Sequence, residues 1–365
     1  MSKQARAAVV YEPEGKFAIE DIELDDLHSG EAYVKIEAVG VCHTDMNMQF
    51  LLGMPAVVGH EGTGIVEEVA PGVDYVKPGD RVIISWPTCG TCPKCLVGRL
   101  DLCEMQFPLN FGGRRADGTQ TIKLKGRPIH GSYFQQSSFA THVVVPVSSL
   151  VKVAGDIPAE VRAAMPCGIM TGAGSVINAF AMGPKDDVVV FGAGAVGLSA
   201  IMAAKVSGVY PIVAVDIHQS RLDLAKELGA SHAFNAREDD VVAKLAELRP
   251  TGFRYAIDTS AKQSSITTAV QCLGSGGVFG VLAVPEPQVP DYSVGTLAFP
   301  KGIRLQFILA GSSTPRLFIP QMLEWYKNGR FPVDRLVHTF PFEQINEAWG
   351  ESASGRVIKP VLLME

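Results

Sequence analysis

The sequence predicts a two-domain α/β protein, with a mixed β domain followed by a doubly wound parallel sheet. Short β-like runs separated by Gly and Pro fill the first part of the chain. From about residue 170, buried apolar runs alternate with helical stretches. The length of 365 residues also favours two domains. We therefore assign residues 1–168 and 311–365 to the first domain and residues 169–310 to the second.

The first domain is predicted from runs of β-branched and apolar residues bounded by turn residues. These runs lie at 33–36, 64–66, 81–84 and 142–145, and a similar run at 361–363 ends the chain. The connections between them are long. This pattern is typical of a mixed β domain.

The second domain begins with the fully apolar run 188–191, which has the composition of a buried parallel strand. A glycine-rich turn leads from it into a helical stretch at 198–206, and the next strand, 212–215, ends at Asp216. Further buried strands are predicted at 255–257 and 278–281. Strands that alternate with helices in this way form doubly wound parallel sheets.

The glycine-rich turn has the spacing G-x-G-x-x-G, at Gly192, Gly194 and Gly197. Its position between a strand and a helix, with Asp216 ending the next strand, fits a dinucleotide-binding fingerprint. Asp216 would accept hydrogen bonds from the ribose hydroxyls and repel a 2′-phosphate, which favours NAD over NADP. The alternative is a glycine-rich turn in some other α/β protein.

Composition excludes several functions. The net charge is −6 and no block of Lys or Arg is present, which argues against nucleic acid as a partner. No apolar stretch is long enough to cross a membrane, and the first residues lack the pattern of a signal peptide. We expect a cytoplasmic protein.

Four of the seven cysteines lie close together, at Cys89, Cys92, Cys95 and Cys103. Because disulfides are rare in a reducing compartment, this spacing indicates a metal site. Four thiolates suit a closed, structural zinc site, and an iron–sulfur cluster or unrelated free cysteines are the alternatives. Cys272 stands alone and is predicted to be a small buried hydrophobic residue.

Two further cysteines and a histidine occur in short motifs: Cys42 in Cys-His-Thr-Asp, His60 in Gly-His-Glu, and Cys167 in Pro-Cys-Gly. Spacing alone does not show that they converge. Together with the four cysteines and the nucleotide fingerprint, however, these motifs resemble the zinc-containing medium-chain dehydrogenase/reductase family from end to end. The segments 109–113, 136–141 and 167–174 resemble its aryl (benzyl) alcohol dehydrogenase branch.

The resemblance implies a GroES-like catalytic domain and a Rossmann NAD-binding domain. It implies that Cys42, His60 and Cys167 ligate a catalytic zinc, with an open position for substrate oxygen. Glu61 would coordinate this zinc transiently, Asp45 would hold the His60 ring, and Thr44 would take the alcohol proton. Contacts to the cofactor would come from residues of both domains: His43, Thr171, Gly192, Gly194, Val196, Gly197, Asp216 and Lys359.

The chain departs from the family pattern at two places. Asn47 stands where many members have a histidine that releases the relayed proton, although members of the aryl branch also tend to lack it. The segment between Cys42 and His60 is short by a few residues, which predicts a wider mouth to the substrate cleft. Apolar residues that could line a pocket or belong to the core are Phe50, Leu51, Met54 and Trp86.

The expected reaction is therefore reversible hydride transfer from a primary alcohol, aryl or allylic, to NAD. Two zinc ions per subunit are implied, one catalytic and one structural, together with a homodimer or homotetramer. The rivals are a zinc dehydrogenase of terpenoid or polyol alcohols, a non-catalytic NAD-binding protein, and a zinc-free quinone reductase of the same superfamily. The last would lack both sets of cysteines.

Overall fold

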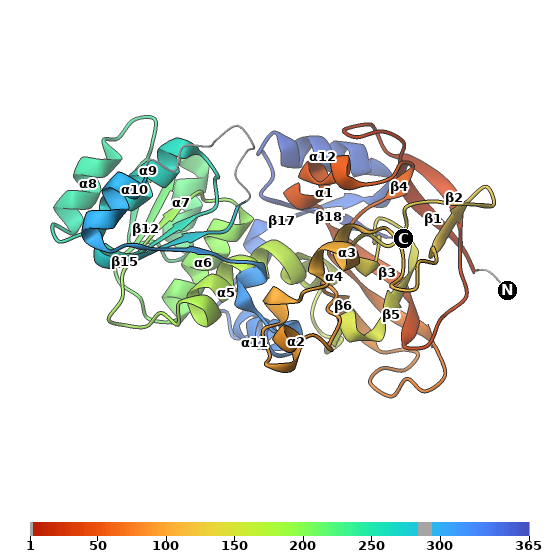
Figure 1. Ribbon diagram of the computed structural model, residues 1–365. Coiled ribbons are helices and arrows are strands. Elements are labelled where there is room, and N and C mark those ends of the chain that lie inside the picture. Colours follow the sequence, from red (N-terminus) through yellow and green to blue (C-terminus); the bar gives the residue numbers. More distant parts are fainter. Residues whose placement is uncertain (1–2, 284–293, 365) are drawn as a thin grey trace. The chain divides into compact units, whose positions relative to one another are not determined.

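The computed structural model describes residues 3–283 and 294–364. The chain divides into two compact units, which are drawn with their elements in Figure 1. The first unit contains Met1–Cys167, Thr314–Glu324 and Val333–Glu365, and the second contains Gly168–Ser313 and Trp325–Pro332. The predicted combination of a mixed β domain and a doubly wound parallel domain is confirmed.

The first unit is built on two sheets. One has the order β4-β1-β2-β7-β8, and the other has the order β10-β6-β5-β3-β18-β17 with β9 also paired to β3. Its strands are β1 (Lys3–Val10), β2 (Ala18–Leu24), β3 (Glu31–Gly40), β4 (Ala56–Val57), β5 (Gly62–Val69), β6 (Arg81–Ile84), β7 (Ile122–Leu124), β8 (Arg127–Pro128), β9 (His142–Pro146), β10 (Leu150–Lys152), β17 (Val337–Pro341) and β18 (Lys359–Leu363).

Short helices fill the connections of this unit. They are α1 (His43–Asn47), α2 (Pro93–Leu96), α3 (Gln106–Phe111), α4 (Ala159–Ala164) and α12 (Ile345–Ala353), while α11 (Pro315–Lys327) passes from the first unit into the second. The central strand β3 is the longest, and its side chains Val34 and Ile36 are buried. Because β3 pairs with β5, β9 and β18, it joins the beginning and the end of the chain in one core.

The second unit is a parallel sheet with the strand order β13-β12-β11-β14-β15-β16. This order is the one typical of dinucleotide-binding folds, in which the ligand binds where the order reverses, here between β11 and β14. The strands are β11 (Val188–Phe191), β12 (Ile212–Asp216), β13 (His232–Asn235), β14 (Phe253–Asp258), β15 (Leu273–Val281) and β16 (Arg304–Phe307).

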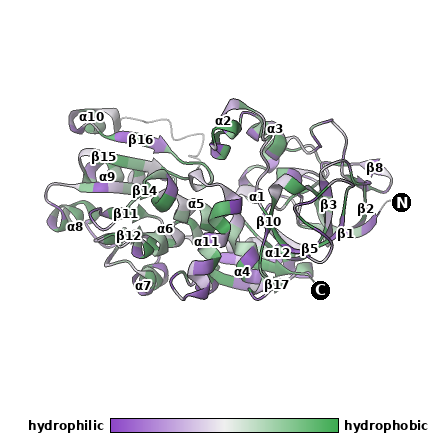
Figure 2. Cartoon of the chain, turned by 90° about the horizontal axis from the view of Figure 1, so that it is seen from below, coloured by the Kyte–Doolittle hydropathy of each residue, from purple (hydrophilic) through white to green (hydrophobic). Residues whose placement is uncertain are grey.

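The helices of this unit, labelled in Figure 1, are α5 (Met170–Gly174), α6 (Ala195–Val206), α7 (Gln219–Leu228), α8 (Val241–Leu248), α9 (Gln263–Cys272) and α10 (Val294–Ala298). Every residue of β11 is buried, as expected of a strand covered on both faces. The edge strand β16 mixes hydrophilic and hydrophobic residues (Figure 2). Cys272 packs in the core of this unit, as predicted.

The strands predicted at 81–84 and 188–191 coincide with β6 and β11. One segment differs from the sequence-based boundaries, because Trp325–Pro332 groups with the second unit although it lies inside 311–365. Its contacts explain the difference: the Arg330 guanidinium donates to the carbonyl of Val206, at the end of α6. Over residues 3–283 and 294–364, every helix is too short or too polar to cross a lipid bilayer.

Candidate metal centres and nucleotide site

The four clustered cysteines form one compact group. The sulfur atoms of Cys89, Cys92, Cys95 and Cys103 all lie within 4.8 Å of one another. Backbone amides point at these sulfurs: the Cys89 N–H donates to Cys103 Sγ at 3.3 Å, and the Cys92 N–H donates to Cys89 Sγ at 3.3 Å. Amide donation, led by Thr91 N–H, lowers the pKa of Cys89 to about 6. The chemistry of this group fits a closed, four-sulfur zinc site.

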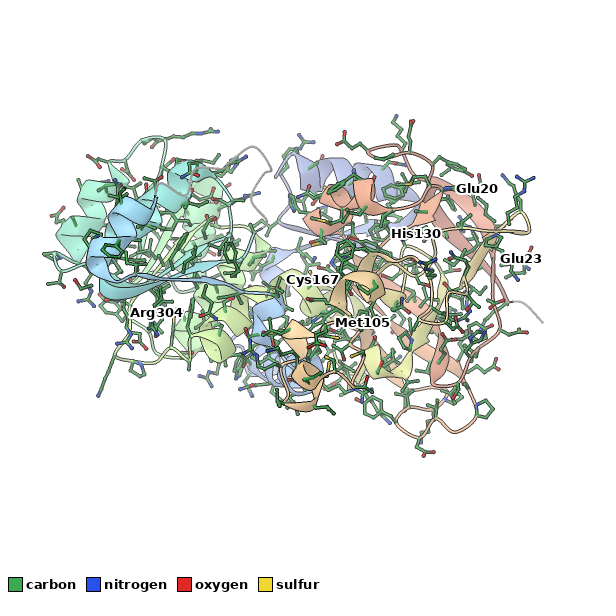
Figure 3. The ribbon with its side chains drawn as sticks, in the orientation of Figure 1. Glu20, Glu23, Met105, His130, Cys167 and Arg304 are labelled. Atoms are coloured by element: carbon green, nitrogen blue, oxygen red, sulfur yellow. The ribbon has the colours of Figure 1, made fainter. Side chains whose placement is uncertain are left out.

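A second cluster brings together residues from three distant segments. Cys42 Sγ, His60 Nε2, Cys167 Sγ and a carboxylate oxygen of Glu61 all lie within 4.8 Å of one another. Cys167 Sγ lies 3.9 Å from Cys42 Sγ and 3.2 Å from His60 Nε2. We call these four residues the mixed centre. Figure 3 labels Cys167 there, and Met105 on the chain after the four-cysteine group.

Local structure places each member of the mixed centre. Cys42 is the N-cap of α1, and a capping box links it to Asp45. His60 and Glu61 lie in the irregular segment between β4 and β5, and Cys167 lies in a π-helical turn, Met165–Ile169, that follows α4. Such π-helical turns are rare and occur often at functional sites, because the extra residue redirects a side chain.

The buried carboxylate of Asp45 holds two parts of the mixed centre. One oxygen, Oδ1, lies 2.7 Å from His60 Nδ1, and the other accepts from the backbone N–H of Cys42 at 3.1 Å. The contact between Oδ1 and His60 Nδ1 directs the other ring nitrogen, Nε2, towards the two sulfurs. The arrangement is the one expected of a metal-ligating histidine whose other nitrogen is held by a carboxylate.

The carboxylate of Glu61 is fully buried, and its two oxygen atoms have different surroundings. Its Oε2 pairs with the ammonium group of the buried Lys359, and its Oε1 has no hydrogen-bond partner among the described residues. An unpartnered buried oxygen is costly. Because Oε1 belongs to a side chain of the mixed centre, a metal ion there is the partner that its chemistry fits.

The charges of the mixed centre act strongly on one another. Burial opposes the charged form of His60, but the Asp45 carboxylate and the Cys42 sulfur together raise the pKa of His60 well above its usual value. Burial also raises the pKa of Glu61 to about 7, against the influence of Lys359. A divalent cation replaces protons on such ligands when it binds. The donor set of two sulfurs, one imidazole and one carboxylate therefore fits zinc.

The glycine-rich turn of the second unit has the geometry that a dinucleotide requires. Gly192 has a φ of 92°, which favours glycine, and a Cβ on Gly197 would lie 1.8 Å from the Gly192 carbonyl oxygen. A Cβ on Gly194, the N-cap of α6, would meet nothing within 4 Å. The first and third glycines therefore serve the fold, and the second leaves space at the start of the helix.

Asp216 ends β12, as predicted, and its carboxylate organises the turn. It accepts hydrogen bonds from the backbone N–H groups of Ala193, Ile217 and His218, at 2.6–2.8 Å. Val196 lies in the first turn of α6. The predicted fingerprint residues of this unit are thus adjacent in space.

The other predicted site residues are placed as follows. Thr44 lies in α1 beside Cys42 and donates its N–H to Cys42 Sγ at 3.5 Å, and His43 and Asn47 are exposed on the same helix. Thr171 lies in α5 of the second unit. Lys359, expected at the cofactor pyrophosphate, has its ammonium group buried against Glu61. Of the pocket candidates, Trp86 is buried, Met54 packs on the core, and Phe50 and Leu51 are exposed.

Sequence reasoning missed three residues that contact the mixed centre from one loop: Tyr133, Phe134 and Gln136. The Tyr133 hydroxyl donates to the Thr44 carbonyl at 3.2 Å, the Phe134 ring stacks on His60, and the Gln136 amide bonds the backbone beside His60. Gln136 entered the sequence analysis only as part of a segment that resembles the aryl branch. Neither hydrophobic periodicity nor ligand spacing marks these positions.

Comparison with known proteins agrees with this architecture. Residues 28–155 match the family model described as the alcohol dehydrogenase GroES-like domain, and residues 195–328 match the zinc-binding dehydrogenase model. A geraniol dehydrogenase from Castellaniella defragrans is 39% identical over 98% of this chain and 97% of its own length.

Two solved structures cover the whole chain and are themselves covered in full. An alcohol dehydrogenase zinc-binding domain protein from Burkholderia ambifaria is 39% identical with a TM-score of 0.96. The benzyl alcohol dehydrogenase from Acinetobacter calcoaceticus is 36% identical with a TM-score of 0.93. A mixed-β unit with two cysteine-rich clusters and a parallel nucleotide-type sheet define a metal-binding dehydrogenase. The chain belongs to the zinc-containing medium-chain alcohol dehydrogenase family.

The contacts of Asp45 lead to a prediction about metal affinity. Asp45→Ala removes the acceptor for His60 and the cap on Cys42, so the mixed centre should bind zinc about 10- to 100-fold more weakly. Asp45→Asn keeps an oxygen that can accept from His60, so its zinc affinity should fall less than that of Asp45→Ala. Zinc affinity is measured by competition with a chelator. Asp117→Ala, which removes an exposed carboxylate 3.0 Å from His28 Nδ1, is the control and should change nothing. Equal affinities for all variants would refute the role given to Asp45.

Proposed function

We propose that this protein oxidises a primary alcohol to its aldehyde with NAD, in a reversible reaction that depends on zinc in the mixed centre. The observation that carries this proposal is the convergence of Cys42, His60 and Cys167, with Glu61 beside them. Because Glu61 would coordinate only transiently, the other three ligands would leave a fourth position for a substrate oxygen, as catalytic zinc sites require. A second zinc in the four-cysteine group would have a structural role.

Bound zinc would supply a Lewis acid that lowers the pKa of an alcohol oxygen, and the dinucleotide would supply the hydride acceptor. The residues of the chain do the remaining work. Asp45 holds the His60 ring in a fixed orientation. The hydroxyl of Thr44, beside Cys42, would accept the alcohol proton while it passes its own proton on along a chain of hydroxyl groups. Lys359 balances the charge of Glu61, so that this carboxylate can remain in the buried centre.

The carboxylate of Asp216 and the open space at Gly194 support NAD as the cofactor. Phosphate groups bind well at helix N-termini, and Gly194 is the N-cap of α6. A 2′-phosphate near Asp216 would be repelled, which favours NAD over NADP. We propose that Val196, in the first turn of α6, also contacts the cofactor, and that His43 and Thr171 do so, as the family resemblance implies.

The relatives support an aryl or allylic alcohol as substrate. One is named geraniol dehydrogenase and one solved structure is a benzyl alcohol dehydrogenase. Geraniol and benzyl alcohol share a feature, since each carries its hydroxyl-bearing carbon next to an unsaturated carbon. A terpenoid alcohol such as geraniol is therefore compatible with this proposal, and a saturated polyol is the separate alternative.

The proposed reaction is tested by incubating the pure protein with NAD and benzyl alcohol, geraniol or sorbitol. We expect NADH to form with the two unsaturated alcohols. Prior removal of the metal by a chelator should abolish NADH formation, and added zinc should restore it. Faster turnover of sorbitol would favour the alternative hypothesis of a polyol dehydrogenase. Absence of chelator-sensitive NADH formation with every alcohol would refute the proposal.

Substitution of two glycines separates cofactor binding from folding. Gly194→Ala places a methyl group in open space, so the free energy of unfolding should change little. If backbone donors there bind the pyrophosphate, NAD affinity should fall about 10- to 100-fold, the value of one hydrogen bond to a charged group. Gly197→Ala forces a methyl group against the Gly192 carbonyl and should cost about 2–3 kcal/mol of stability. NAD titration and denaturant unfolding measure the two effects. Unchanged NAD affinity in Gly194→Ala would contradict this placement.

We propose a homodimer or homotetramer that is joined partly through β16. Among residues 3–283 and 294–364 this strand forms one edge of the parallel sheet, and its side chains Leu305 and Phe307 are exposed. An unpaired edge with exposed apolar residues favours association with another strand. Light scattering measures the mass of the oligomer directly. Phe307→Lys should shift the oligomeric state towards smaller species, and an unchanged mass would exclude this edge as the interface.

A further inference from the structure

The loop Tyr133–Ser138, which we call the clamp loop, has an unusual backbone. Phe134, Gln135 and Ser137 have φ values of 49°, 53° and 48°. Left-handed conformations are uncommon for residues other than glycine, and they persist only where the surrounding contacts impose them. Three of them within four residues show that this loop is held in a shape that its own sequence does not favour.

The contacts that hold the clamp loop converge on the segment that carries His60 and Glu61. The Ser137 hydroxyl donates to the Val57 carbonyl at 2.6 Å, and the Ser138 N–H donates to the Gly59 carbonyl at 2.9 Å. The Phe134 ring stacks on the His60 imidazole, with ring centroids 4.5 Å apart. The loop therefore follows the segment from Val57 to His60 along its length.

The side chain of Gln136 makes the next contact, and it encloses Glu61. Its Nε2 donates to the carbonyl of His60 at 2.9 Å, and its Oε1 accepts from the N–H of Gly62 at 3.1 Å. Gln136 is 1% exposed, so both bonds lie away from water. A single planar amide thus fixes the peptide groups on both sides of Glu61.

Two glycines allow the clamp loop to come this close. Gly59 has a φ of 95°, and a Cβ there would lie 2.6 Å from the nitrogen of Phe139, the residue that directly follows the clamp loop. A Cβ on Gly62 would lie 2.8 Å from Ser138 Cβ and 3.3 Å from Gln136 Oε1. The glycines on either side of His60-Glu61 are therefore explained by the approach of this loop.

We propose that Gln136 is a positioning residue of the mixed centre, whose amide fixes the direction in which both His60 and Glu61 point at the metal. Free rotation of either peptide group beside Glu61 would move the His60 ring and the Glu61 carboxylate apart. With both groups bonded to one rigid amide, the two side chains keep a common target. This inference rests on the proposed function only in that it requires a metal ion in the mixed centre.

Gln135 offers a matched control within the same loop. It is 8% exposed, and its Nε2 donates to the carbonyls of Leu109 and Arg114 at 3.1 and 2.9 Å. Both glutamines therefore make two buried hydrogen bonds to backbone groups. Only those of Gln136 reach the segment that carries the metal ligands. A merely structural role for the loop would make the two positions equivalent.

The test compares Gln136→Met with Gln135→Met in protein loaded with cadmium in place of zinc. Cadmium NMR distinguishes a four-sulfur site from a site with two sulfurs and a nitrogen by chemical shift. We expect Gln136→Met to shift the resonance of the mixed centre and to speed its loss to a chelator about 10- to 100-fold. The four-cysteine resonance should stay unchanged in both variants, and Gln135→Met should match the unsubstituted protein at both sites.

If the two variants give the same mixed-centre resonance and the same rate of metal loss, Gln136 has no positioning role. If the unsubstituted protein shows no mixed-centre resonance at all, the proposed metal site fails, and this inference fails with it. Gln136→Asn provides a second variant should methionine prevent folding. Its side chain is one methylene shorter and cannot span both peptide groups, so the same changes are expected.

Discussion

The packing of several acidic and sulfur-bearing side chains into one buried space is the constraint on which the first unit depends. Asp45, Glu61, Cys42 and Cys167 all lie around His60, and Lys359 is the cation that the chain places against Glu61. Without compensation, such a cluster would drive its members apart or hold protons. Fixed hydrogen bonds hold this cluster together, and a metal ion bound there would offset its remaining negative charge. The capping box of α1 and the Asp45–His60 contact supply some of these bonds.

The same requirement explains why backbone and side chains are tied so closely around the mixed centre. A metal ligand must be held within about 0.5 Å of its working position by contacts that do not themselves touch the metal. Cys42 is fixed as a helix N-cap and Cys167 by a π-helical turn. His60 and Glu61 belong to no regular element. They are held by neighbouring loops, and this is the physical reason for the clamp loop and for Gly59 and Gly62.

Much of the fold could be predicted from the sequence, because local pattern decides it. The run Val188–Phe191 is apolar throughout since both of its faces are covered, and Gly192, Gly194 and Gly197 follow it at a spacing set by the turn. The convergence of Cys42, His60 and Cys167 required family resemblance, since 107 residues separate the last two. The contacts of Gln136 and the pairing of Lys359 with Glu61 could not be predicted, because a buried polar contact between distant segments leaves no periodic pattern in the sequence.

The segment Trp325–Pro332 has a consequence for how the protein can be divided. The chain passes between the units at 167/168, 313/314, 324/325 and 332/333, so neither unit is a single continuous piece. A chimera that exchanged residues 168–313 alone would combine the α6 of a relative with this chain's own Trp325–Pro332, although both stretches belong to one compact unit. Recombination between relatives should therefore succeed only when both stretches are inherited together. The second unit is thus exchangeable only as two separate stretches of sequence, 168–313 and 325–332.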